Sequence, residues 1–380
     1  MDAKRDNAPR AAGTNTAFLQ YGGQAVIEGV MMRSPHYFAV ACRKPDGSVV
    51  TKREEVDKSI IGRLKWLNRP FLRGTLALID AMALGTRALA FASNVQMEAE
   101  QQKAQANQIP PASDRLRETL AEEGEVAAAS IVNGPPVLVP EQMPKSGNIN
   151  DIAIGGTIAF SFVFGIALFV LLPTVLTQLG KKIGLFSITY NQTLWLNIVD
   201  GLIRMAIFFG YIGLISLMPQ IQRVFQYHGA EHKAINTLEA GLPLTPDNAL
   251  NASRIHPRCG TSFIFIVLVI NLIVFAFLPR PPLWIRFPMH LAIVPLVAGI
   301  AYEVIKFAGK FRRNALVMAV LAPGMWSQYL TTREPDREQV EVALTSLRAV
   351  LEAEGHSVSD AGVVGLVPAP NPLEPEAVTA

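Results

Sequence analysis

The chain of 380 residues contains only two cysteines, Cys42 and Cys259. Two cysteines cannot form the disulfide network that holds small secreted domains together, so the sequence favours a reducing compartment. The first twenty residues contain no apolar core of the signal-peptide type, and we therefore expect the N-terminus to be retained.

A strong excess of charge is also missing. The formal net charge is +3, and the lysines and arginines occur singly or in pairs among acidic residues rather than in one block. Nucleic-acid binding requires a concentrated basic surface, so we expect no nucleic-acid partner. The pair Gly22-Gly23 is not followed by the Gly-Lys-Ser/Thr of a Walker loop, so it is not a phosphate loop of that type.

Long apolar runs are what the sequence has instead, since half of its residues are apolar. A helix of about 20 apolar residues crosses a hydrocarbon core of about 30 Å, and its internal hydrogen bonds satisfy the backbone there. We predict a mainly α-helical integral membrane protein, with the lipid bilayer as its partner. The predicted spans are residues 152–177, 194–218, 260–278 and 287–305, the last of them broken by Pro295.

Two intramembrane charges in the second span are four residues apart, Asp200 and Arg204, and therefore lie on one helix face. A charge inside a span costs about 2.5–3.5 kcal/mol on insertion scales, so the pair should face protein rather than lipid. We interpret it as a structural ion pair near the membrane edge. These two charges and Glu303 would also fit a transporter. No inverted repeat is visible, so a transporter is the weaker alternative.

Two further apolar stretches are ambiguous. Residues 70–92 carry Arg73, Asp80 and Arg87 at intervals of seven, which indicates an amphipathic helix on the membrane or against the spans. Residues 315–330 are short and contain Pro323-Gly324, so we expect an interfacial or re-entrant helix. The sequence does not decide whether either stretch enters the membrane.

The distribution of lysine and arginine predicts the orientation, because cytoplasmic loops carry more of both. The loops between spans one and two, and between spans three and four, each carry two basic residues. More of them lie between spans two and three and after span four. We therefore expect a multi-pass protein of the inner or plasma membrane with both termini in the cytoplasm.

The remaining segments complete the predicted organisation. Residues 38–55 alternate and contain the turn signal Pro45-Asp46-Gly47, which predicts a β-hairpin in a small α+β cytoplasmic portion. Residues 335–353 predict an amphipathic helix, and 113–122 a short helix in a linker. The predicted division is a disordered N-terminus (1–20), an α+β segment (21–97), a flexible linker (98–150), spans one and two (151–220), a His-rich loop (221–259), spans three and four (260–308), interfacial and amphipathic helices (309–354) and a disordered tail (355–380).

The segment "YHGAEHKAIN", residues 227–236, carries the clearest chemistry. As a helix it places His228 and His232 one turn apart, so both imidazoles can reach one metal ion. His-x-x-Glu-His is the inverse zincin pattern, in which the glutamate, here Glu231, is the catalytic base. Glu239 follows on the same broad face, and Gly241 and Pro243 should end the helix.

A second motif strengthens this interpretation. In "HPRCGTS", residues 256–262, His256 and Cys259 are three apart in a turn and form a plausible chelating pair. Nitrogen and sulfur ligands favour zinc, although another divalent transition metal is also compatible. The candidate ligands are His228, His232, His256, Cys259 and Glu239. The alternatives are helix caps, hydrogen bonds to carbonyls, or contact with lipid phosphate through Arg254 and Arg258.

A third candidate is "YGGQAVIEGVMMRSP", residues 21–35, whose only charges are Glu28 and Arg33. Its glycines suggest close backbone approach or unusual dihedral angles. We interpret the segment as an ion-paired turn that leads into the predicted hairpin, and keep both charged residues as site candidates.

These motifs, with "APGMWSQYLTTREPDREQVEVAL" near the C-terminus, resemble the YqhQ-like family of bacterial membrane proteins. The resemblance covers most of residues 20–350. It implies several membrane helices and an intracellular histidine-rich loop. The family is one of unknown function that is described as a predicted metal-dependent enzyme, and the resemblance implies no substrate. The family motifs match at Glu28, Arg33, His228, Glu231, His232, His256 and Cys259.

Two functional hypotheses follow. The first is a metal-dependent enzyme at the membrane, namely a hydrolase with zinc or a similar divalent metal. The second is a non-enzymatic scaffold or accessory factor in membrane-protein assembly, with other membrane proteins as partners. The sizeable cytoplasmic portion motivates the second, whereas the ligand cluster within residues 228–259 motivates the first.

Overall fold

A computed structural model describes residues 21–56, 73–108, 156, 160–161, 163–185, 192–310, 314–359 and 362–366. The predicted N-terminal tail, the short helix at 113–122 and most of the linker lie outside these residues. Within them the protein is mainly helical with a small sheet, as predicted. Its elements are β1 (Gly22–Val26), β2 (Gly29–Arg33), β3 (Tyr37–Arg43), β4 (Val49–Glu55), α2 (Arg73–Gln108), η3 (Ala167–Leu171), α6 (Leu172–Lys182), α7 (Gln192–Ile215), α8 (Pro219–Glu239), α9 (Pro246–Asn251), α10 (Gly260–Ala276), α11 (Leu283–Lys310), α12 (Ala315–Trp326), α13 (Gln328–Thr331), α14 (Arg337–Ala353), β5 (His356–Ser359) and β6 (Gly362–Leu366).

The N-terminal sheet has four antiparallel strands in the order β1-β2-β3-β4. The predicted hairpin is confirmed as β3 and β4, which pair from Tyr37↔Glu55 to Arg43↔Val49. The ion-paired turn predicted before it is wrong, because residues 22–33 form a second hairpin. Its two-residue turn, Ile27-Glu28, has none of the usual turn residues, and Glu28 adopts a positive φ of 51°. Because the turn lacks these residues, the sequence pattern did not predict this hairpin.

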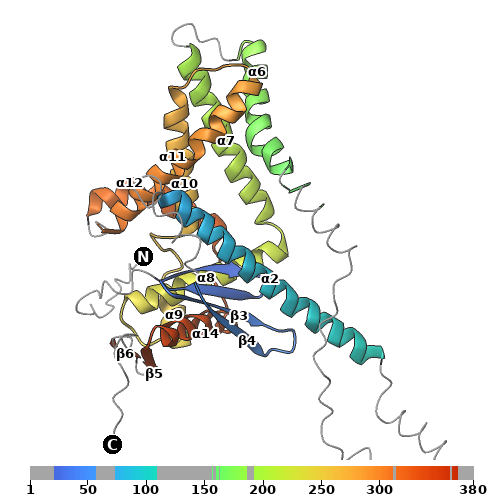
Figure 1. The fold of residues 1–380 in the computed structure, drawn as a ribbon, viewed down its shortest axis with the longest axis vertical. Coiled ribbons are helices and arrows are strands. Elements are labelled where there is room, and N and C mark those ends of the chain that lie inside the picture. The colour runs from blue at the N-terminus through green and yellow to red at the C-terminus, as the bar shows by residue number, and fades with distance from the viewer. Residues whose placement is uncertain are drawn as a thin grey trace, which may run out of the picture.

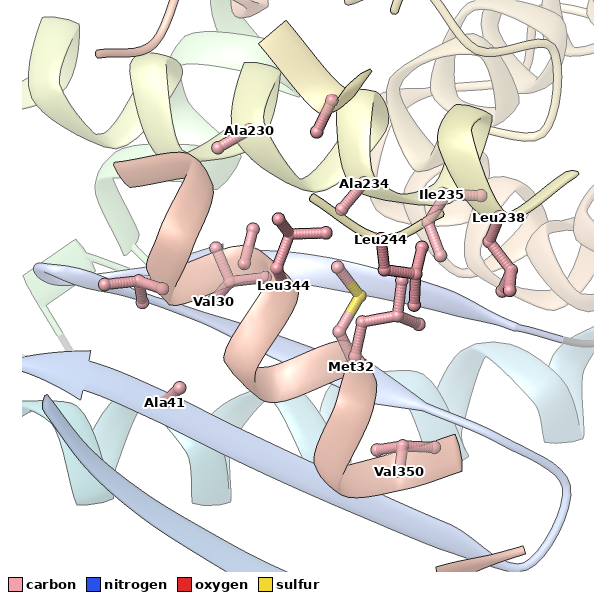
Figure 2. Close-up of a cluster of buried hydrophobic side chains, with 14 of the residues drawn as sticks. Val30, Met32, Ala41, Ala230, Ala234, Ile235, Leu238, Leu244, Leu344 and Val350 are labelled. Atoms are coloured by element: carbon pink, nitrogen blue, oxygen red, sulfur yellow. The ribbon is translucent and has the colours of Figure 1, made fainter. Parts of the chain in front are cut away.

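Each face of this sheet is covered by helices (Figure 1). On one face α2 packs on alternate strand residues, so that Leu84 and Ala88 meet Val26, Phe38 and Cys42 in one buried cluster. On the other face α14 and α8 cover the intervening residues. Figure 2 shows that second cluster, with labelled members Val30, Met32, Ala41, Ala230, Ala234, Ile235, Leu238, Leu244, Leu344 and Val350. The period-2 alternation of the strands thus places apolar side chains on both faces.

Helix α2 covers residues 73–92 of the predicted amphipathic helix 70–92, whose first three residues lie outside the described residues, and it continues to Gln108. The predicted linker therefore begins too early, at residue 98. Two of its three regularly spaced charges bind the sheet: Asp80 pairs with Arg33, and Arg87 donates to Glu54 at 2.7 Å. Both charges within this apolar helix therefore have an oppositely charged partner in the sheet, so that protein rather than lipid compensates them.

Four helices are long and apolar enough to cross a membrane, among the residues the structure describes. They are Gly74–Lys103, Val163–Lys182, Gln192–Ile215 and Trp284–Phe307. The number equals the prediction, but the membership differs. The first contains most of the stretch 70–92, for which the sequence predicts an amphipathic helix on the membrane or against the spans, and it packs on the sheet and against α11. The predicted third span is the shorter apolar helix α10 of 17 residues. The sequence "LPRPPL" follows α10, and prolines cannot extend it.

Two predicted helix breaks do not occur. Helix α11 continues through Pro288 and Pro295, and α12 continues through Pro323. Prolines are tolerated inside apolar bundle helices, because neighbouring groups and small local adjustments satisfy the carbonyl groups that they free. The exposed large apolar side chains of these helices include Leu291 and Val320. Such surfaces are compatible with a lipid bilayer.

At the C-terminal end, the predicted amphipathic helix is confirmed as α14. A capping box between Asp336 and Gln339 starts it, and Leu344 and Leu347 are buried against the sheet. The predicted disordered tail is wrong in its first part, because β5 and β6 pair antiparallel. The predicted histidine-rich loop is also largely helical, since α8 and α9 occupy most of it.

Candidate metal centre

Helix α8 positions the two histidines of the first motif. It begins at Pro219, whose ring suits the first helical turn, and ends before Gly241, whose φ is +68°. His228 and His232 lie one turn apart as predicted, with ring centroids 4.4 Å from each other. The side chain of His232 is 1 % exposed, so this helix face points into the protein.

The third member of the cluster comes from the start of α10. Cys259 is the N-cap residue of that helix, and its Sγ lies 3.2 Å from Nε2 of His228. One ligand atom from each of His228, His232 and Cys259 can be chosen so that all lie within 4.8 Å of one another. A helix N-terminus stabilises negative charge, which suits a thiolate ligand.

Backbone carbonyl groups determine the tautomer of both imidazoles. Nδ1 of His228 lies 2.8 Å from the carbonyl oxygen of Thr331, and Nδ1 of His232 lies 2.6 Å from that of Arg254. A carbonyl oxygen only accepts, so each Nδ1 carries the proton and each Nε2 keeps its lone pair. This second hydrogen bond is what metal-bound histidines usually have.

His232 Nε2 is buried and has no hydrogen-bond partner among the described residues. Leaving a buried acceptor unsatisfied costs about 1–3 kcal/mol. A metal ion would satisfy it, because the lone pair faces the same space as the imidazole of His228 and the thiol of Cys259. The donor set of two nitrogens and one sulfur suits zinc or another transition metal.

Two glycines allow the surrounding backbone to approach this cluster. A Cβ at Gly229 would lie 2.1 Å from the carbonyl oxygen of Arg333, so the segment that supplies the Thr331 carbonyl could not stay in place. A Cβ at Gly23 in β1 would lie 2.8 Å from Cγ of Glu231. The first and third sequence motifs therefore meet at Glu231.

Glu231 lies beside the histidines. Its Oε2 is 3.9 Å from Nε2 of His228 and 3.7 Å from Nε2 of His232. Burial raises the pKa of Glu231, while His228 and the backbone N–H of Gly23 act in the opposite direction. The carboxylate is thus close to the site without being one of the three clustered ligands.

The other two predicted ligands pair with each other beside the cluster, with the ring centroids of His256 and His232 5.9 Å apart. His256 Nε2 lies 3.3 Å from Oε1 of Glu239, and Arg258 donates to the same carboxylate. Burial raises the pKa of Glu239, but His256 and Arg258 outweigh it and hold the pKa at about 2. Burial also lowers the pKa of His256, so the ion pair is between Glu239 and Arg258, with a neutral imidazole beside it.

A buried glutamine holds the turn that contains Cys259. Gln328 accepts from the backbone N–H of His256 at 2.9 Å and donates to the His256 carbonyl at 2.8 Å. Its amide also donates to Ser262 in the first turn of α10 at 2.7 Å. Sequence reasoning missed Gln328, because nothing in "MWSQYL" distinguishes a buried clamp from a surface glutamine.

Glu28 and Arg33 do not pair with each other. Glu28 accepts from Arg223 Nη2 at 2.7 Å and from the Tyr227 hydroxyl at 3.2 Å, which connects the β1-β2 turn to α8. Arg33 pairs with Asp80 of α2 instead. Both candidates therefore connect the sheet to helices, and neither contacts the three clustered ligands in an observed hydrogen bond or ion pair.

A cavity of about 650 Å³ lies between the β1-β2 hairpin and α2, next to Glu231 and the pair of Glu239 and Arg258. Gly23, which contacts Glu231, and Arg258, which pairs with Glu239, are both in its wall. Arg33 and Asp80 also line this cavity and contribute charge. The cavity is large enough for a small-molecule group or a peptide segment.

Comparison with known proteins gives a family but no activity. Residues 69–353 match the family described as a protein of unknown function, DUF1385. The chain is 35% identical over 341 residues to the uncharacterized protein YqhQ of Bacillus subtilis (strain 168), covering 89% of this chain and 94% of that protein. No solved structure matches. The chain therefore belongs to the DUF1385 family of proteins of unknown function.

Proposed function

We propose that the protein is a metal-dependent hydrolase of the membrane, with a zinc-class ion bound by His228, His232 and Cys259. The observation that carries this proposal is the buried, unpartnered Nε2 of His232, whose ring is held by the Arg254 carbonyl. A hydrogen-bonded core histidine would not leave that atom without a partner.

Three protein ligands leave one position of a tetrahedral site open, as in catalytic zinc sites. Zinc bound there would act as a Lewis acid and lower the pKa of a water molecule that it binds. Glu231 is close enough to take a proton in that space, which is the role of the glutamate in the His-x-x-Glu-His pattern.

The adjacent cavity is the proposed substrate site. Its wall combines apolar residues such as Leu84 with the charged groups of Arg33 and Arg258. By the predicted orientation it opens at the cytoplasmic face. His256 and Glu239 are assigned a supporting role, because their mutual contact and Arg258 already satisfy them.

Metal analysis of the full-length protein in detergent tests the site itself. We expect about one equivalent of zinc, lost in both His232→Ala and Cys259→Ser but retained in the matched controls His36→Ala and Cys42→Ala. Circular dichroism checks that each variant keeps its helices. Metal-free wild-type protein with normal stability, or equal metal in all variants, would overturn the site.

Cobalt substitution separates the enzyme from the alternative, a scaffold with a closed structural site. A cobalt site with an open position changes its visible spectrum when azide is added, whereas a site closed by four protein ligands does not. We expect the azide response in the wild type. We also expect Glu231→Gln to retain the metal, because the carboxylate is not one of the three ligands. An azide-insensitive spectrum would favour the scaffold.

A further inference from the structure

A second polar cluster lies at the opposite end of the helices from the sheet, where α6 ends and α7 and α11 begin (Figure 1). At its centre is the predicted pair of Asp200 and Arg204, confirmed at 3.1 Å. Arg286 also contacts the same carboxylate, at 3.3 Å, and Arg280 lies 3.9 Å from it. One carboxylate therefore faces three guanidinium groups.

The described helices at this end offer no other acid to balance them. Asp200 is the sole acidic residue in α6, α7, α10 and the part of α11 before Glu303. The side chains of Arg286 and Asp200 are only 7% and 5% exposed. An excess of buried positive charge is costly unless an anion compensates it.

A cavity of about 290 Å³ opens beside this cluster. Lys181, Arg280 and Arg286 line it together with the polar side chains of Thr177 and Gln192. Arg280 Nη1 is buried and has no hydrogen-bond partner among the described residues. Three cationic groups thus line one space, and one of them, Arg280, also has a buried donor without a partner among the described residues.

We infer that this cavity binds a phosphate-class anion. A tetrahedral group with several oxygens can accept from guanidinium forks and an ammonium that approach from different sides, which a single carboxylate cannot do as well. The group can come from free phosphate or from a phospholipid headgroup. Leu179 and Trp195, which adjoin the lining residues Gln178 and Leu196 in the sequence, expose apolar side chains, and this makes a headgroup the expected source.

The test uses full-length protein purified in a neutral detergent and phosphate-free buffer. Calorimetry measures binding of inorganic phosphate. Native mass spectrometry measures retention of phosphatidylglycerol against an uncharged glycolipid. Arg280→Gln removes the unpartnered donor without removing a hydrogen bond to Asp200, and Lys182→Gln is the matched control, because Lys182 adjoins Lys181 but does not line the cavity.

We expect Arg280→Gln to weaken binding about tenfold to a hundredfold, as expected for a lost charged hydrogen bond. Lys182→Gln should bind like the wild type. Phosphate binding that follows this pattern supports a free-anion site, and selective phosphatidylglycerol retention that follows it supports a headgroup site. No binding of either probe, or equal effects of the two substitutions, overturns the inference.

Two measurements keep this result interpretable. If Arg280→Gln unfolds, Arg280→Lys keeps the charge and should retain weaker binding. If neither Arg280→Lys nor Lys181→Gln changes the binding of phosphate or phosphatidylglycerol, the result counts against the site. Zinc content should be unchanged in every one of these variants, because the metal cluster is at the other end of the helices. Failure of one site therefore does not imply failure of the other.

Discussion

The two buried polar clusters of this protein are constructed on opposite principles. At the sheet end, His228, His232 and Cys259 present lone pairs and a thiol, and backbone carbonyls orient the imidazoles. At the far end, guanidinium groups surround Asp200 and present donors. The first arrangement suits a cation and the second an anion. Burial alone says little about function, whereas the charge and hydrogen-bonding type of the unsatisfied atoms indicate which ligand class to test.

The largest expected effect is at the far end. Asp200→Asn removes the carboxylate from three arginines, and breaking a buried ion pair typically costs about 3–5 kcal/mol. We expect a strongly lowered thermal unfolding midpoint in detergent. The double variant with Arg204→Gln should recover part of the loss, because it removes one uncompensated charge. No coupling in that double-mutant cycle would mean that the arginines do not depend on Asp200.

An intermediate effect is expected at Gly229 in the metal centre. Gly229→Ala places a Cβ against the Arg333 carbonyl, and overpacking of this kind costs about 1–3 kcal/mol. The displaced segment carries the Thr331 carbonyl, so metal content should fall as well. Gly213→Ala in α7 is the control, because a Cβ there meets nothing within 4 Å. Equal stability and metal content in both variants would show that the close approach at Gly229 is unimportant.

The smallest effect on stability, but a sharp one on reactivity, concerns the two cysteines. Burial in the sheet core raises the pKa of Cys42 to about 12, so its thiol stays protonated and slow to alkylate below that pH. In single-cysteine variants we expect zinc to slow alkylation of Cys259 at least about tenfold, while Cys42 is indifferent to zinc. Mass spectrometry measures both rates. Zinc-independent alkylation of Cys259 would contradict its role as a ligand.

Local patterns predicted the elements that position the metal site. The i, i+4 spacing of His228 and His232 places both side chains on one face of α8, whatever that helix packs against. Gly241 ends the helix. The alternation in residues 38–55 predicted the hairpin, and helical spacing in residues 335–353 predicted α14. These features depend on nearest neighbours along the chain, so the sequence contains them directly.

The predicted helices show what local patterns leave out. The three charges in residues 70–92 predicted an amphipathic helix on the membrane or against the spans, but not its partners: Asp80 and Arg87 pair with Arg33 and Glu54 of the sheet. The prolines at 295 and 323 argued for breaks that the helices do not have. The partners of the charges in α2 are distant in sequence, and no window along the chain contains them.

By itself, the sequence determined that this is a membrane-helix protein with a small sheet, that His228 and His232 share a face, and that few acids accompany the basic residues of its spans. Only the tertiary structure decided which candidate ligands meet. It brought Cys259 to the histidines, paired His256 with Glu239, and placed the carbonyls of Thr331 and Arg254 behind the two rings. The physical reason is that helical periodicity is a property of adjacent residues, whereas a ligand set depends on long-range packing that brings separate segments within bonding distance.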